Sequence, residues 1–122
     1  CGLSPEDTEA LTAVIAGCCR AKLRLVGGDV EDRGARRLLN FGHTFGHGYE
    51  AAGGFSTYTH GEAVAAGMCR TLRWQAAHGC DGSLLPRLEK ILTKYRLPTA
   101  LDCDDAVLRR YVQRDKKRRA DA

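Results

Sequence analysis

The sequence predicts an all-α fold. Apolar residues recur three or four positions apart along most of the chain, and no segment alternates polar and apolar residues as a half-buried strand does. Capping residues and glycines mark the limits of five helical segments. With 122 residues, of which 43% are hydrophobic and 28% charged, the chain has the size and composition of one globular domain. We therefore expect a single helical domain over residues 1–122.

The first expected helix begins at Ser4-Pro5, because serine caps helices and proline suits the first helical position. Apolar residues follow at helical spacing, for example at Leu11 and Val14. Lys22 lies near the end of this segment, and Gly27-Gly28 terminates it.

A second helix is expected over residues 35–50. It would contain three glycines, each of which lowers helix propensity by up to about 1 kcal/mol relative to alanine, and these are Gly42, Gly46 and Gly48. We expect another part of the protein to approach the backbone of such a helix closely. Polar residues would form a stripe along it at spacings of four, three and four. A stripe that faces solvent would carry no functional meaning, whereas one that faces inward must line a polar cleft, which is the interpretation we favour. The stripe consists of Arg36, Asn40, His43 and His47.

Three further helices are expected along the rest of the chain. One covers residues 61–77, and the next covers residues 84–95 after a cap at Asp81 or Ser83. The last begins at Asp104 or Asp105 and continues into a basic tail.

The basic residues are concentrated at the C-terminal end. Seven basic and two acidic residues follow from Arg109 onward, in a chain of net charge +4. A solvated helix end and an anion site for phosphate or carboxylate both fit this cluster. Nucleic-acid binding is disfavoured, because the cluster is short and Tyr111 is its one aromatic residue.

Hydropathy and cysteine usage exclude other classes of protein. The longest apolar stretch, Ala63–Cys69, is far shorter than the roughly 20 residues of a membrane helix, and no signal peptide is visible. The six cysteines include no C-x-x-C pair, which favours free thiols in a reducing cytoplasm. The chain begins with Cys1 rather than Met, so we expect it to be a piece of a longer protein.

Three of the four histidines lie within 18 positions of one another. His43 and His47 are four residues apart and would share one face of a helix, which suits a metal ion. On spacing alone, His43, His47 and His60 form a candidate ligand set. Two histidines at this spacing also occur without any metal, and spacing does not decide between the two interpretations.

Two longer runs carry a resemblance to a known family. Leu39–His47 reads L-N-F-G-H-T-F-G-H, and after Glu50 the run His60–Met68 reads H-G-E-A-V-A-A-G-M. Together they closely resemble 3-dehydroquinate synthases and their sugar phosphate cyclase relatives, over about Cys18 to Lys117. Those enzymes join a nucleotide-binding α/β domain, which holds NAD, to a C-terminal helical domain. The resemblance implies that this chain is the helical domain and that the nucleotide-binding domain lies upstream of it.

The resemblance also implies roles for individual residues. The metal ion, Zn²⁺ or Co²⁺, would be held by His43, His60 and a glutamate of the upstream domain. His47 would then contact substrate or move a proton, in place of the ligand role that spacing suggests. The implied substrate-binding and catalytic residues are Lys22, Arg36, Asn40, His47 and Lys116. Lys117 is the alternative to Lys116, and the NAD-binding residues would lie mainly upstream.

The implied activity is that of a lyase of the shikimate pathway and aromatic amino acid biosynthesis. It converts 3-deoxy-D-arabino-heptulosonate 7-phosphate, a phosphorylated sugar acid, into 3-dehydroquinate and phosphate. A cytoplasmic homodimer is expected for the full-length protein, and this chain alone is expected to be inactive. Two alternatives stay open. One is a related cyclase acting on sedoheptulose 7-phosphate or glucose 6-phosphate, and the other is a non-catalytic helical binding module.

Overall fold

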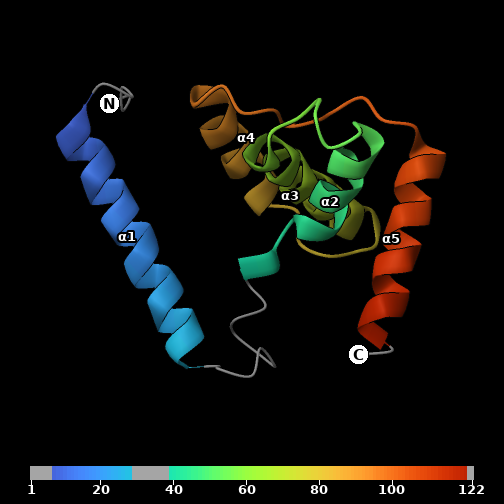
Figure 1. Ribbon diagram of the computed structural model, residues 1–122, viewed down its shortest axis with the longest axis horizontal. Helices are drawn as coiled ribbons and strands as arrows, with labels where there is room; N and C mark the ends of the chain where they lie inside the picture. The colour runs from blue at the N-terminus through green and yellow to red at the C-terminus, as the bar shows by residue number, and fades with distance from the viewer. Residues whose placement is uncertain (1–6, 29–38, 121–122) are drawn as a thin grey trace. The chain divides into compact units, whose positions relative to one another are not determined.

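The structure is a computed structural model that describes residues 7–28 and 39–120, with side chains as far as Asp115. This part of the chain contains five α-helices and no strand (Figure 1), which confirms the all-α prediction. The chain divides into two compact units, Cys1–Phe41 and Gly42–Ala122, and each is considered by itself. A single domain over residues 1–122 stays a prediction.

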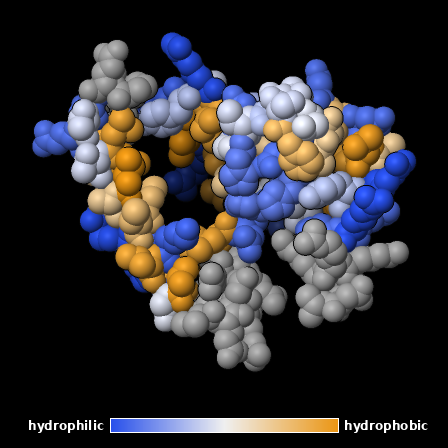
Figure 2. Space-filling view, in the orientation of Figure 1, coloured by the Kyte–Doolittle hydropathy of each residue, from blue (hydrophilic) through white to orange (hydrophobic). Residues whose placement is uncertain are grey.

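The first unit contains one long helix, α1, Thr8–Gly27. Asp7 caps it, since one oxygen of its carboxylate accepts a hydrogen bond from the Ala10 amide at 3.0 Å. The predicted start at Ser4-Pro5 lies outside the described residues. Asp7 is the cap that the structure describes, and its negative charge also suits the positive end of the helix dipole. No residue of α1 is buried, and apolar side chains lie exposed along it (Figure 2).

The second unit contains four helices: α2, His43–Ala52; α3, His60–Ala77; α4, Leu84–Lys94; and α5, Asp105–Ala120. The helix α2 packs against α3 and α5, and α3 also packs against α4. The predicted ranges of the last three helices are confirmed to within a residue or two. In the part of the chain that the structure describes, no helix is both long and apolar enough to cross a membrane.

Two clusters of buried residues form the core of the second unit. The first lies where α2, α3 and α5 meet, and it consists of Tyr49, Ala63, Ala66 and Leu108. The second joins α3 to α4 and consists of Ala65, Cys69 and Leu92. Since α3 contributes to both clusters, it is the central helix of this unit.

The first turns of α3, α4 and α5 are fixed in different ways. Thr59 and Glu62 form a capping box at α3, in which each side chain accepts a hydrogen bond from the other's backbone amide. At α5 the Asp104 carboxylate accepts from the Ala106 amide at 2.8 Å, as predicted. At α4 neither predicted cap bonds a helix amide, because the Asp81 carboxylate accepts instead from the amide and hydroxyl of Ser83.

The prediction of one helix over residues 35–50 is wrong. Gly42 has a φ of 81°, in the left-handed region, and α2 begins only after it, at His43. Asn40 lies in a short 3₁₀ turn before this break, and Arg36 lies outside the described residues. The predicted polar stripe therefore does not continue back to Asn40, because a left-handed residue ends the helical spacing. Of the described residues of the predicted stripe, only the two histidines, His43 and His47, lie together on one helix, α2.

The glycines of α2 do lie close to other elements, as predicted. A Cβ atom on Gly46 would stand 3.2 Å from the Cα of Val64, and one on Gly48 would stand 2.5 Å from a methyl carbon of Leu108. From the other side, a Cβ on Gly67 of α3 would stand only 2.2 Å from the Gly42 carbonyl oxygen. The backbones of α2 and α3 are therefore nearly in contact.

This contact predicts a difference between two glycines of the same helix. Gly67→Ala should destabilise the protein by about 1–3 kcal/mol or more, because the new methyl group meets backbone atoms that cannot move aside. Gly61→Ala is the matched control. Nothing lies within 4 Å of its Cβ position, so it should be neutral or stabilise by at most about 1 kcal/mol. Urea unfolding of the three proteins measures this, and equal stabilities of both variants would contradict the contact.

The cysteines supply a second prediction. The five described cysteines are free thiols, of which Cys69 is fully buried and Cys80 exposed. Burial raises the pKa of the Cys69 thiol, which lowers its thiolate fraction. A maleimide should therefore label Cys80 in the native protein and Cys69 only after unfolding in urea. Peptide mass spectrometry locates the label, and native labelling of Cys69 as fast as that of Cys80 would disprove the packing.

Candidate functional site

Three histidines come together where α2 meets the start of α3. His43 and His47 lie one turn apart on α2, with ring centroids 5.5 Å apart. His60 is the first residue of α3, and its ring centroid lies 5.3 Å from that of His43 and 6.1 Å from that of His47. The structure thus confirms that the two histidines of α2 share a face, and it brings the third histidine onto that face.

Glu50 is a member of this cluster that sequence reasoning did not single out. An oxygen of its carboxylate lies 2.5 Å from Nδ1 of His60. The Glu50 side chain is only 16% exposed, whereas that of His60 is 60% exposed. Glu50 follows His47 by three positions and His43 by seven, so helical spacing places all three on one face of α2. This spacing is the signal that could have found it.

The cluster offers part of a metal site. Among the described residues, no group of three or more His, Cys, Asp or Glu side chains is placed to hold a metal ion. The set of His43, His47 and His60 inferred from spacing alone is therefore not a complete site. His43 and His60 nevertheless present two neighbouring imidazoles, the nitrogen donors that Zn²⁺ and Co²⁺ accept. Catalytic zinc sites use three protein ligands, so these two residues fit the metal if one more ligand comes from elsewhere.

The residue before Glu50 belongs to the apolar core of the second unit. Tyr49, which precedes Glu50 on α2, is 2% exposed and packs against Ala63, Ala66 and Leu108. Burial raises the pKa of the Tyr49 hydroxyl, an effect that the charge of Arg70 opposes in part. Tyr49 is therefore part of the packing that joins α2 to α3 and α5.

A hydrogen bond joins α2 to α5, the helix that carries the C-terminal basic residues. The Thr44 hydroxyl donates a hydrogen bond to the Asp115 carboxylate at 3.2 Å, joining the residue after His43 to α5. The helix α5 packs along α2 (Figure 1), and its backbone continues directly from Asp115 to Lys116 and Lys117. The structure thus places the residue before Lys116 at α2, and it does not describe the two lysine side chains.

The remaining predicted residues belong to the other unit. Lys22 lies exposed on α1, and Asn40 lies exposed in the turn before Gly42. Arg36 lies outside the described residues. The part that these three residues take in the site stays a prediction.

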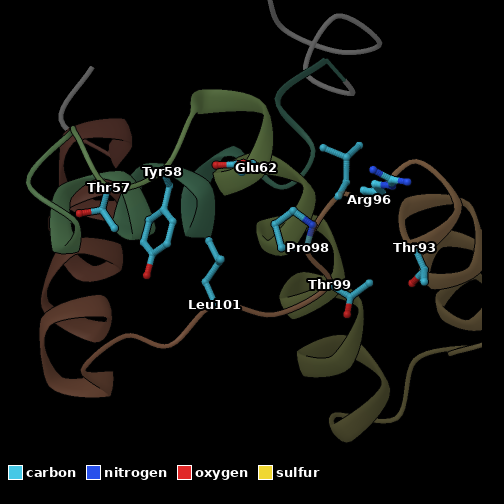
Figure 3. A pocket seen from close by; sticks show the side chains of 9 residues that line it. Thr57, Tyr58, Glu62, Thr93, Arg96, Pro98, Thr99 and Leu101 are labelled. Carbon is cyan, nitrogen blue, oxygen red and sulfur yellow. The ribbon is translucent and has the colours of Figure 1, made fainter. Parts of the chain in front are cut away.

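An open hollow lies near the start of α3, but it does not coincide with the histidine cluster (Figure 3). The loop before α3 and the segment after α4 form its walls, with Tyr58, Glu62, Arg96 and Leu101 among the lining residues. None of the three clustered histidines lines it. Glu62 is already engaged in the capping box of α3. The chemistry of the side chains therefore points to the histidine cluster, which is also where the sequence motifs lie.

Comparison with known proteins identifies a family that this chain matches. Residues 2–118 match the family model described as 3-dehydroquinate synthase C-terminal. The 3-dehydroquinate synthase of Shewanella loihica is 41% identical over 120 residues, covering 94% of this chain and 33% of the relative. That of Shewanella denitrificans is 40% identical with the same coverage, and that of a further Shewanella strain is 38% identical. This chain spans about a third of the length of the curated relatives that it matches.

The hydrogen bond between Thr44 and Asp115 generates a prediction. Thr44→Val keeps the shape of the side chain but removes the donor, so stability should fall by about 0.5–1.5 kcal/mol. Thr71→Val is the matched control, since the Thr71 hydroxyl bonds only the Gly67 carbonyl one turn back in its own helix. Its stability should hardly change in the same urea titration. If the two variants lose equal stability, the link between α2 and α5 contributes nothing.

Proposed function

This chain belongs to the 3-dehydroquinate synthase family, whose C-terminal domain it matches, and on this premise we propose that it is the metal- and substrate-binding part of such an enzyme. The observation that carries the proposal is the pair of imidazoles, His43 and His60, with ring centroids 5.3 Å apart. Both stand in the two sequence runs that resemble the family, and they come from two different helices. We propose them as two ligands of a Zn²⁺ or Co²⁺ ion, with the third supplied by an upstream nucleotide-binding domain.

The proposed reaction converts 3-deoxy-D-arabino-heptulosonate 7-phosphate into 3-dehydroquinate and phosphate, as a lyase of the shikimate pathway. Bound at His43 and His60, the metal ion supplies Lewis-acid polarisation of a substrate oxygen, and NAD, held upstream, supplies reversible acceptance of a hydride. The proposal includes a cytoplasmic location and a homodimer for the whole protein, without a membrane or nucleic-acid partner.

The residues of this chain would bind and orient the substrate. His47 stands beside both proposed ligands, where its imidazole can contact the substrate phosphate or move a proton. Lys116 follows Asp115, whose carboxylate is bonded to α2, and we propose its ammonium as the partner of a substrate phosphate or carboxylate. Lys22, Arg36 and Asn40 complete the proposed binding set. A flexible substrate that passes through several steps needs such positioning and charge pairing more than further chemistry from the protein.

Phosphate release tests the proposal. We expect the protein with its upstream domain, NAD and Zn²⁺ to release phosphate from the seven-carbon sugar acid phosphate. His43→Ala should lower the rate by more than about 100-fold, since loss of even a ligand's hydrogen-bond partner costs 10–100-fold. His78→Ala is the matched control, because His78 stacks on Trp74 at the far end of α3. It should leave the rate nearly unchanged.

Other outcomes separate the alternatives. Release from sedoheptulose 7-phosphate or glucose 6-phosphate in place of the sugar acid would assign the chain to a related cyclase. No release from any of the three would overturn the enzyme proposal and favour a helical binding module. The 122-residue chain by itself is expected to release no phosphate, because it offers two of the three proposed metal ligands.

A further inference from the structure

We propose that Glu50 is a positioning residue for His60, holding its imidazole in the tautomer protonated at Nδ1 so that Nε2 is presented to the metal ion. The observation is the 2.5 Å separation between the Glu50 carboxylate and Nδ1 of His60. The presentation to a metal rests on the proposed function. The hydrogen bond and the tautomer are properties of this chain alone.

Both partners stand on fixed elements. Glu50 lies within α2, whose backbone is held against α3 by the contact between Gly67 and Gly42. His60 opens α3, and the capping box between Thr59 and Glu62 encloses it in the first turn. The carboxylate and the imidazole are therefore brought together by two anchored helices, which is the arrangement that a precise site requires.

The chemistry of the two groups fixes the tautomer. An ionised carboxylate can only accept hydrogen bonds, so Nδ1 of His60 must carry the proton that lies between them. A neutral imidazole has one N–H group, so Nε2 then keeps its lone pair. Metal ions bind the unprotonated nitrogen, and a carboxylate on the other nitrogen makes the ring more basic as well as better oriented.

The exposures of the two side chains suit this division of roles. Glu50 is largely covered, which strengthens its hydrogen bond by shielding it from water. His60 is 60% exposed and so remains open to a ligand. Direct ligation by Glu50 is the rival interpretation. It is disfavoured because the Glu50 carboxylate is already bonded to Nδ1 of His60 and its side chain is only 16% exposed.

The first test measures the tautomer without metal or substrate. Long-range ¹H–¹⁵N correlation spectra of the metal-free chain, at a pH where its imidazoles are neutral, report which ring nitrogen carries the proton. His78 is an internal reference, because its Nδ1 lies 2.8 Å from the Trp74 carbonyl oxygen, which can only accept. We expect His60 to match His78 in the wild type, and Nε2 protonation of His60 in the wild type would overturn the proposal.

Three variants test whether Glu50 sets the tautomer of His60. Glu50→Ala should shift His60 toward the Nε2-protonated tautomer that histidine favours in water, whereas Glu50→Gln should preserve the wild-type spectrum, because its amide oxygen still accepts. Glu89→Ala is the control, since Glu89 pairs with Arg73 and not with a histidine. If Glu50→Ala fails to fold by circular dichroism, the wild-type and Glu50→Gln spectra still decide the tautomer.

The second test measures Zn²⁺ affinity of the protein with its upstream domain. Glu50→Ala should weaken zinc binding by about 10–100-fold, as loss of a ligand's hydrogen-bond partner does, and Glu50→Gln should recover most of it. Equal losses in both variants would mean that the carboxylate itself binds the ion, and would overturn the proposal. A wild-type protein that releases no phosphate would count against the proposed function, while the metal-free tautomer measurement would stand.

Discussion

The close contact between the backbones of α2 and α3 is the constraint on which the rest of the second unit depends. Gly67 of α3 lies against the backbone at Gly42 and Gly46, with no room for a Cβ atom. His60 precedes Gly67 by seven positions, two helical turns, and His43 precedes Gly46 by three. Both histidines therefore stand on the faces where the two helices touch. The short distance between their rings follows from the close approach of the two helix backbones at Gly42, Gly46 and Gly67.

The helix α5 packs against another side of α2. Leu108 is 1% exposed and occupies the space that a side chain at position 48 would need. Farther along α5, Asp115 accepts a hydrogen bond from Thr44. One apolar and one polar contact thus hold α5 to α2 at two points. The polar contact joins residues 71 positions apart, and it brings the part of α5 that precedes Lys116 to the start of α2.

The features that could be predicted from the sequence are those that depend on residues close together in the chain. The spacing of His43 and His47 was enough to place them on one face, and the glycines of α2 indicated that another element approaches closely. The break at Gly42 was not predictable in this way, because residues 36 and 40 continue the helical spacing by coincidence. A side chain at Gly42 would lie 2.6 Å from Met68, so the left-handed residue is set by a contact with α3, far along the chain. Local spacing carries no information about such a contact.

The role of Glu50 also depends on a contact that local spacing does not reveal. Its position on the histidine face can be read from helical spacing, yet its partner is on the next helix, beyond a loop that contains Phe55 at positive φ. Only the packing of α2 on α3 decides that the carboxylate meets Nδ1 of His60. A covered acid behind an exposed imidazole is the arrangement of a site whose support is buried and whose reactive edge is open. The glycine contact is thus a condition for the chemistry as well as for the fold, because a wider helix separation would carry His60 away from both Glu50 and His43.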